Sequence, residues 1–149
     1  MTKIRVTKEF GFESAHALWN YDGKCKNVHG HSYRLFVTVL GEPIENENDV
    51  KLGMVIDFGD LKKIVIENIV NRFDHTLFVN NKAEIKNILE TDQMFERFET
   101  LNYQPTCENF VIHFAEILKQ TLPKSVNLFS IRLYETPSSY AEWFAEDQR

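Results

Sequence analysis

Apolar and polar residues alternate in the N-terminal part of the chain, and this pattern predicts strands. From residue 4 to residue 12 the apolar side chains stand an even number of positions apart, as on the buried face of a strand; they are Ile4, Val6, Phe10 and Phe12. If the alternation continues, His16 lies on the same face. A second strand is expected from His29 to Gly41, after a turn at residues 21–24, and a short third one from Met54 to Phe58.

Helical spacing follows further along the chain. Apolar residues recur every three or four positions from Leu61 to Phe73 and from Phe110 to Leu122, which predicts two amphipathic helices. Asp60 is the expected N-cap of the first helix and Thr106 that of the second, which ends near Pro123. Residues 81–103 have no clear period and predict a broken helix. A last strand carries three apolar residues on one face, namely Phe129, Ile131 and Leu133.

The order of these elements predicts an α+β fold. Adjacent strands without a helix between them favour an antiparallel β-sheet, and the helices then pack on one of its faces. No repeat, linker or abrupt change of composition divides the 149 residues, so we expect one domain over residues 1–149. A domain of this length buries roughly 68–70% of its unfolded surface, which is enough for a core of its own.

The composition excludes several classes of protein. With 43% hydrophobic and 26% charged residues, the chain is neither collagen-like nor disordered. A net charge of −5 without a basic run argues against general binding to nucleic acid or anionic membranes. No apolar run approaches the ~20 residues of a membrane helix, and the alternating N-terminus is unlike a signal peptide, so a cytoplasmic protein is expected. The two cysteines, Cys25 and Cys107, are then reduced.

Three histidines fall on apolar strand faces by parity. His29 and His31 stand two positions apart on the second strand, so both imidazoles can reach one cation, and Gly30 between them leaves room for close packing. The alternative is a pair of histidines satisfied by ordinary hydrogen bonds. Burying His16 as a third imidazole without a shared purpose is costly, which favours a metal site. Three neutral histidines suit Zn²⁺ and leave its fourth position open, as in catalytic sites.

Two further positions carry groups that can transfer protons. Cys25 lies just before the histidine pair, between Lys24 and Lys26, and nearby positive charge favours a thiolate; the alternative is a small buried apolar side chain. Asp74 and His75 follow the first helix. A carboxylate can orient an imidazole or relay its proton, although neighbours in sequence need not face each other.

Two carboxylates are candidates for binding a ligand. Glu135 ends the apolar face of the last strand by parity, where an ionised carboxylate needs a partner. A planar ligand edge with N–H and NH₂ groups would supply two donors, and the alternative is an internal ion pair with Lys124 or with Arg132, whose parity is wrong. Glu108 lies in the first turn of the second helix, where complementing the helix dipole is the simpler explanation.

Six short motifs follow one another in an order that resembles a known family. They are Phe12-Glu13-Ser14-Ala15-His16, Cys25 with His29-Gly30-His31, Ile56-Asp57-Phe58-Gly59-Asp60-Leu61-Lys62, Phe73-Asp74-His75, Pro105-Thr106-Cys107-Glu108-Asn109 and Tyr134-Glu135-Thr136-Pro137. Over nearly its whole length the chain resembles the 6-pyruvoyl-tetrahydropterin synthase family. The short gap between Cys25 and His29 resembles the bacterial 6-carboxy-tetrahydropterin synthases of the queuosine pathway. Residues 81–103 look longer than usual for the family, and Cys107 stands where Ala or Thr is common.

The resemblance implies a fold, a reaction and a set of roles. The fold is the tunnelling fold, in which antiparallel sheets of a homo-oligomer, a hexamer or tetramer, join into a barrel with active sites between subunits. The substrate is 7,8-dihydroneopterin triphosphate, and the products are 6-carboxy-5,6,7,8-tetrahydropterin, acetaldehyde and triphosphate. By resemblance, the zinc ligands are His16, His29 and His31, the catalytic residues are Cys25, Asp74 and His75, and the pterin-binding residues are Glu135, Glu108 and Thr106.

Two other functions fit the same residues. A pyruvoyl-type synthase uses the same constellation and retains the side-chain carbons of the substrate. A noncatalytic zinc-binding interaction domain would close the metal shell with Cys25 and would have no open coordination position.

Overall fold

The chain forms a single mixed sheet. The computed structural model describes the backbone of residues 1–149 and all side chains except those of Lys86 and Ile88. Over these residues the strands are β1 (Ile4–Ala17), β2 (His29–Gly41), β3 (Thr76–Asn80), β4 (Phe98–Leu101), β5 (Val126–Thr136) and β6 (Ser139–Phe144). Their order across the sheet is β4-β3-β1-β2-β5-β6. The pairs β1–β2, β2–β5 and β5–β6 are antiparallel, whereas β1–β3 and β3–β4 are parallel.

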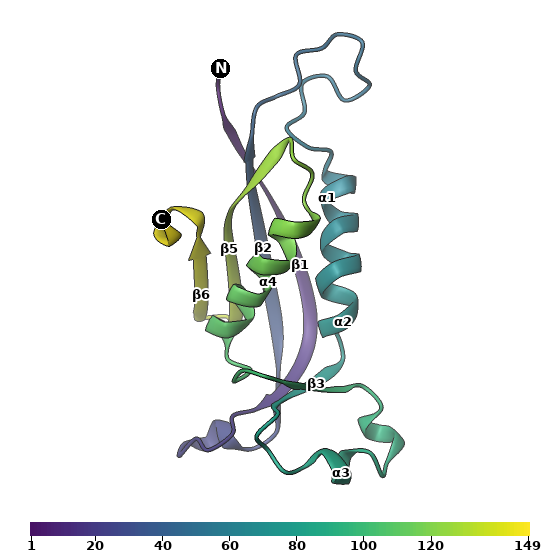
Figure 1. The fold of residues 1–149 in the computed structure, drawn as a ribbon, viewed down its shortest axis with the longest axis vertical. Coiled ribbons are helices and arrows are strands. Elements are labelled where there is room, and N and C mark those ends of the chain that lie inside the picture. Colours follow the sequence, from purple (N-terminus) through teal and green to yellow (C-terminus); the bar gives the residue numbers. More distant parts are fainter.

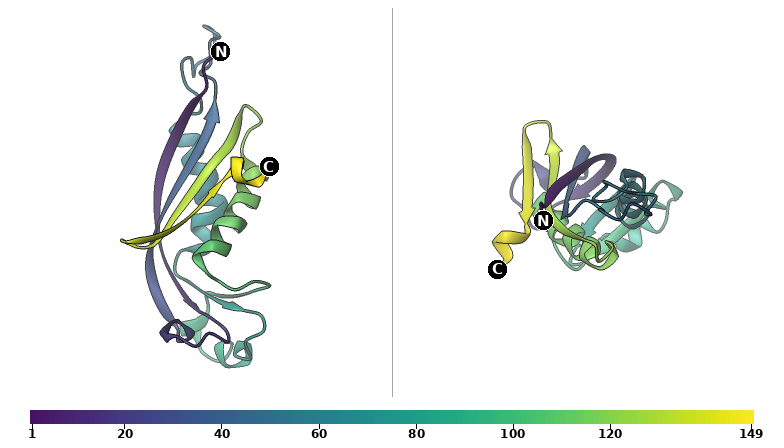
Figure 2. Two further views of the ribbon diagram at one scale, coloured as in Figure 1. Left: turned by 90° about the vertical axis from the view of Figure 1, so that its left-hand side faces the viewer. Right: turned by 90° about the horizontal axis from the view of Figure 1, so that it is seen from above.

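Two helical rods cover one face of the sheet (Figure 1). The first runs through α1 (Phe58–Val65), a π-helical turn (Ile66–Val70) and α2 (Asn71–Phe73), and the second is α4 (Cys107–Thr121). The side view in Figure 2 shows the resulting two layers, which confirm the predicted α+β class. Short elements complete the fold: α3 (Lys86–Leu89) and 3₁₀ turns at Lys24–Lys26, Gln93–Phe95 and Ala145–Gln148. None of the helices in the described part of the chain has the length and apolar character needed to cross a membrane.

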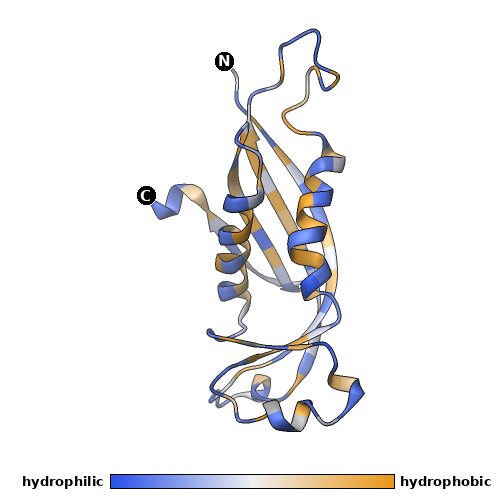
Figure 3. Cartoon of the chain, turned by 45° about the vertical axis from the view of Figure 1, so that its right-hand side comes forward, coloured by the Kyte–Doolittle hydropathy of each residue, from blue (hydrophilic) through white to orange (hydrophobic). Residues whose placement is uncertain are grey.

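The core lies between the sheet and the two rods. The predicted alternation on β2 is confirmed, because Tyr33, Leu35, Val37 and Val39 are all buried. Aromatic rings meet around Phe73, whose centroid lies 4.6 Å from that of Phe78 and 4.7 Å from that of Phe114. Figure 3 shows apolar residues concentrated on the strands and on the helix sides next to them. Such rings bury large apolar areas and therefore dominate core energetics.

Two expectations about the start of the first helix are wrong. Residues 54–58 form no strand, because their hydrogen bonding stays within the loop, where the carbonyl of Met54 accepts from the amide of Ile44 at 3.0 Å. The N-cap is Asp57, whose Oδ1 accepts from the amide of Gly59 at 2.6 Å. Asp60 belongs to the first turn and pairs with Lys51. The two aspartates are three positions apart, and the extended backbone at Asp57 decides which of them caps the helix.

The sheet has three strands that the pattern did not predict, and these are β3, β4 and β6. All five residues of β3 are buried, so the strand shows no alternation. The predicted broken helix over residues 81–103 is therefore only partly right, since α3 and a 3₁₀ turn precede β4, which pairs with β3. A register shift in the β2–β5 pairing skips Phe129, which contacts Arg5 and does not join the core cluster of Ile131 and Leu133.

Three strands have a side without a neighbouring strand within the described chain, and one of them is the short β4, which pairs with β3 alone. β3 pairs only with residues 14–17 of β1, so residues 4–13 of β1 have β2 alone beside them. β6 pairs with β5 alone. Such edges present unpaired N–H and C=O groups that can pair with another chain.

We predict that α4 is anchored by its aromatic face. Phe114→Ala should lower the free energy of unfolding by about 3–5 kcal/mol, because the ring packs against Phe73 and Phe110 and leaves a cavity when removed. Ile112→Ala, on the same helix but 49% exposed, should cost about 1 kcal/mol or less. Urea unfolding of both variants at equal protein concentration is the measurement, and equal costs would contradict the assignment of faces.

Candidate functional site

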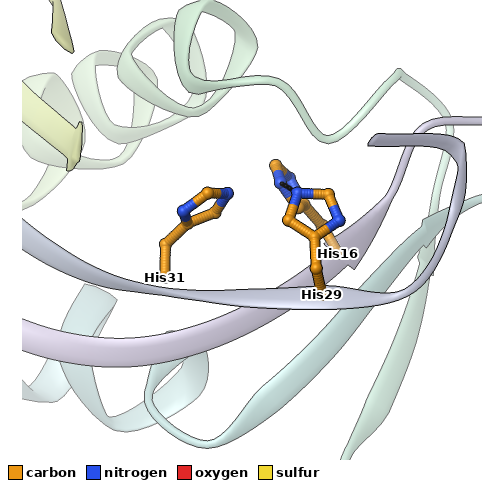
Figure 4. Close-up of side chains that lie close together, drawn as sticks. All are labelled: His16, His29 and His31. Atoms are coloured by element: carbon orange, nitrogen blue, oxygen red, sulfur yellow. Dashed lines mark hydrogen bonds between the residues drawn. The ribbon is translucent and has the colours of Figure 1, made fainter. Parts of the chain in front are cut away.

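The pairing of β1 with β2 brings the three histidines together. His16 is the direct partner of His29, and Ser14 is the partner of His31. All three side chains project to the side of the sheet that the helices cover (Figure 4). One nitrogen from each ring lies within 4.8 Å of the others. The parity argument thus placed these residues correctly, at the C-terminal end of β1 and the N-terminal end of β2.

Backbone carbonyls fix the tautomers of two of these rings. Nδ1 of His16 lies 2.6 Å from the carbonyl oxygen of Pro105, and Nδ1 of His29 lies 2.7 Å from that of Asn27. A carbonyl only accepts, so each Nδ1 donates and each Nε2 is left with a lone pair. The two Nε2 atoms are 3.0 Å apart. Two lone pairs facing at that distance repel unless a proton or a metal ion lies between them.

Protonation is disfavoured at two of the three rings. Burial lowers the pKa of His16 to about 4, so this ring is neutral near pH 7. Burial also lowers the pKa of His31, against the opposing effect of Glu135. Nε2 of His31 is buried and has no hydrogen-bond partner among the described residues. Neutral imidazoles with converging free nitrogens are what a divalent first-row metal ion requires, so the cluster fits a metal.

Glu135 lies beside this cluster. Its Oε1 is 3.6 Å from Nε2 of His31. The β5–β6 pairing shifts register between Tyr134 and Thr136, so Glu135 sits at a bulge, a feature that redirects a side chain. The alternative ion pair with Arg132 is not formed, because Arg132 binds Glu142 at 2.6 Å.

The turn before α4 closes the cluster on another side. Pro105, whose carbonyl accepts from His16, is followed by Thr106, which is the N-cap of α4 as predicted. The Oγ1 of Thr106 accepts from the amide of Asn109 at 3.2 Å. Glu108 is exposed in the first turn of α4. Thr106 and Glu108, the pterin-binding residues predicted in this segment, therefore closely follow Pro105, whose carbonyl contacts His16.

Asp74 and His75 face each other but stand apart from the three histidines. Asp74 Oδ2 lies 3.1 Å from Nδ1 of His75, whose side chain is 73% exposed. The amide of Glu13 donates to Asp74 Oδ1 at 2.9 Å and is the main reason that the pKa of Asp74 is lowered. His75 lines a cavity of about 480 Å³ together with Glu13, Ser32 and His31. Within one chain, neither Asp74 nor His75 belongs to the group of possible metal ligands among the described residues.

The two cysteines lie in different surroundings. Cys25 is half-buried in the Lys24–Lys26 turn and does not belong to the group of possible metal ligands among the described residues. Cys107 is buried, its thiol donates to the carbonyl of Leu133, and burial raises its pKa to about 12. Cys107 is therefore held in an inert, structural environment.

Two residues near the site gave no functional signal in the sequence. Tyr33, two positions after His31, keeps a buried hydroxyl without a hydrogen-bond partner among the described residues. Its alternation with Leu35 indicated only a core position. Arg97 binds the turn that carries Asp74 and His75, and nothing in its local sequence distinguishes it from a surface arginine.

Several proteins with similar sequences carry the name 6-carboxy-5,6,7,8-tetrahydropterin synthase. A 6-carboxy-5,6,7,8-tetrahydropterin synthase of Haemophilus influenzae is 34% identical over 142 residues, which are 94% of this chain and 98% of that protein. A protein of the same name from Rickettsia conorii is 31% identical over 141 residues, 93% of this chain and 99% of the relative.

The fold and the family profile agree with these relatives. The structure of Caenorhabditis elegans 6-pyruvoyl tetrahydropterin synthase is similar to this one with a TM-score of 0.69 at 26% identity, and 97% of each chain is covered. The family profile described as PTPS, 6-pyruvoyl tetrahydropterin synthase, matches residues 5–146. The resemblance inferred from the six motifs is thereby confirmed, and the chain belongs to the 6-pyruvoyl tetrahydropterin synthase family.

Proposed function

We propose that the protein converts 7,8-dihydroneopterin triphosphate into 6-carboxy-5,6,7,8-tetrahydropterin, with release of acetaldehyde and triphosphate, in queuosine biosynthesis. The name shared by the relatives supports this reaction. The observation that carries the proposal is the histidine cluster with a carboxylate at its side, 3.6 Å from His31. A metal site and an acceptor for N–H donors lie together at one end of the sheet, as a pterin with an oxygen-bearing side chain requires.

Zinc is the ion proposed for the cluster, held by His16, His29 and His31. The converging free nitrogens and the lowered pKa of His16 support a site for neutral imidazole ligands, which suit Zn²⁺. When bound, zinc supplies Lewis acidity that makes the neighbouring O–H and C–H protons of the substrate side chain easier to remove. Because Cys25 lies outside the ligand group, the cluster supports an open site and not the closed shell of an interaction domain.

Glu135 is the proposed anchor of the pterin ring. Its carboxylate offers two acceptor oxygens to the amino and ring N–H groups, a charge-assisted pairing of the kind that arginine makes. Thr106 and Glu108, on the turn that contacts His16, are the proposed further contacts. Holding the ring here sets the substrate side chain over the histidines, where correct orientation lowers the barrier by several kcal/mol.

Cys25 and His75 are the proposed bases. Asp74 accepts from Nδ1 of His75, which leaves Nε2 with a lone pair for proton transfer. Two bases on different elements can remove and deliver protons at different faces of the substrate, as tautomerisation, triphosphate elimination and side-chain cleavage require.

We propose that the site is completed between subunits of a homo-oligomer, a hexamer or a tetramer. Two observations support this: the separation of His75 from the cluster within one chain, and the open sheet edges at residues 4–13 and at β6. Pairing of such edges between copies would extend the sheet and bring the His75 of one copy toward the cluster of another. Light scattering at micromolar concentration should show an oligomer, and a monomer that is fully active would contradict the shared site.

Product analysis tests the reaction. Incubation with 7,8-dihydroneopterin triphosphate should give a product with the mass of 6-carboxytetrahydropterin and acetaldehyde. Cys25→Ala should lose on the order of 10²–10⁴-fold in turnover, as expected for a proton-transfer group, whereas Cys107→Ala should retain activity. A pyruvoyl product without acetaldehyde would indicate the pyruvoyl-type reaction, and no product at all would overturn the proposal.

Metal content tests the ligand assignment. We expect about one zinc per chain in the native protein and at least a roughly hundred-fold weaker affinity in His31→Ala, since even outer-shell partners of a metal site contribute 10–100-fold. His75→Ala is the matched control and should keep its zinc, because His75 lies outside the cluster. Elemental analysis after dialysis measures both. Zinc retention by His31→Ala, or zinc loss from His75→Ala, would refute the assignment.

Pterin binding tests the anchor. Glu135→Gln keeps the size of the side chain but replaces one acceptor oxygen with a donor, which should cost roughly 2–4 kcal/mol, or about thirty- to a thousand-fold in affinity. Glu67→Gln, an exposed position on the first helical rod, is the control and should leave the affinity unchanged. Fluorescence titration of the zinc-loaded variants gives the comparison. An affinity of Glu135→Gln within threefold of the parent would show that the pterin is held elsewhere.

A further inference from the structure

The turn that carries Asp74 and His75 has a strained backbone. His75 has a φ of +56°, in the left-handed region that residues with a Cβ atom seldom adopt. Such a conformation persists only where the surroundings hold it in place. The turn joins α2 to β3. The last carbonyl groups of a helix have no N–H partner within the helix, so those at the end of α2 need donors from elsewhere.

One side of the turn is held by β1. The amide of Glu13 donates to the carboxylate of Asp74, and the carbonyl of Glu13 accepts from the amide of His75. These two bonds fix the amide of His75 and the side chain of Asp74. They leave the carbonyls on the other side of the turn to be satisfied by a different element.

The other side is held by Arg97, which lies just before β4 in the long segment 81–103. Nη2 of Arg97 lies 2.8 Å from the carbonyl oxygen of Asp74 and 2.9 Å from that of Asn71, and it lies 3.1 Å from Oγ1 of Thr76. It also lies 3.4 Å from the carbonyl of Arg72. One guanidinium therefore bridges the last turn of α2 and both flanks of His75, and its charge complements the C-terminal end of the helix.

The backbone of Arg97 is fixed independently of its side chain. Its carbonyl accepts from the amide of Leu77 at 2.9 Å, and the next residue, Phe98, is the pairing partner of Leu77. Replacing the side chain thus leaves the segment attached to β3. Arg72, close by, pairs with Glu99 on β4 and donates no side-chain hydrogen bond to the turn.

The geometry points to Arg97 as a positioning residue that holds the Asp74–His75 turn in its catalytic conformation. Supplying this arginine is then one role of the long segment 81–103. The inference rests on the proposed function of His75 as a base. An imidazole misplaced by about 1 Å can cost on the order of 10²-fold in rate. The proposed metal ligands and the proposed pterin anchor Glu135 lie on other elements, namely β1, β2 and β5. Loss of the clamp should therefore lower kcat and leave substrate binding nearly unchanged.

Arg97→Met removes the donors and keeps the aliphatic stem. We expect kcat to fall about 10- to 100-fold, with KM within about threefold of the parent and zinc content unchanged. Hydrogen exchange of the His75 and Glu13 amides should accelerate, while exchange within α4 stays as in the parent. Arg97→Lys should restore part of kcat, because an ammonium can reach a carbonyl but lacks the planar fork of the guanidinium.

Arg72→Met is the matched control, since it removes an arginine that also ties the helix to β4 but does not contact the turn with its side chain. It should keep kcat within about threefold. Equal losses in both arginine variants, a parental kcat in Arg97→Met, or unchanged exchange at His75 and Glu13 would each overturn the inference. If the parent itself forms no pterin product, the proposed function fails, and the exchange experiment still decides whether Arg97 holds the turn.

Discussion

The antiparallel register between β1 and β2 is the constraint on which the site depends. With His16 opposite His29, two imidazoles with carbonyl-fixed tautomers direct their free nitrogens at each other across 3.0 Å. A shift of β2 by one residue would turn His29 to the face opposite His16 and separate the two imidazoles. The register is in turn fixed by the buried apolar residues of both strands, from Phe10 and Phe12 on one strand to Tyr33 and Leu35 on the other.

The apolar core and the histidine cluster lie on the same face of the sheet, and placing polar rings there has an energetic cost. Polar groups withdrawn from water need partners. The Nε2 atoms of His16 and His29 lie 3.0 Å from each other, and Nε2 of His31 makes no hydrogen bond among the described residues, with the carboxylate of Glu135 3.6 Å away. The aromatic core reaches them through Tyr33, whose ring centroid lies 5.7 Å from that of His31 and 5.0 Å from that of Phe12. The fold thus holds the three imidazoles in place, which would leave little ordering for the proposed metal binding.

The proposed catalytic groups do not form one cluster within the chain. The three histidines and Glu135 lie together, whereas His75 opens into a cavity whose lining includes Glu13, Ser32 and, from the cluster, His31. Pairing of the open sheet edges between copies of the chain is the proposed way to bring His75 of one copy to the histidine cluster of another. The segment 81–103 contributes on the His75 side, through β4 and through the hydrogen bonds of Arg97.

The sequence by itself determined the features that depend on local period and spacing: β1 and β2 with their inward histidines, the two amphipathic helices, the cap at Thr106, and the motif order that identifies the family. It did not determine β3, because a strand buried on both faces has no alternation, nor the choice of Asp57 over Asp60 as the cap, because both have the right chemistry. The tertiary structure alone decided that Asp74 and His75 lie outside the cluster of His16, His29 and His31, and that Arg97 hydrogen-bonds to the turn that carries Asp74 and His75. Those contacts join residues more than twenty positions apart, and their formation depends on which strands pair, which no local pattern encodes.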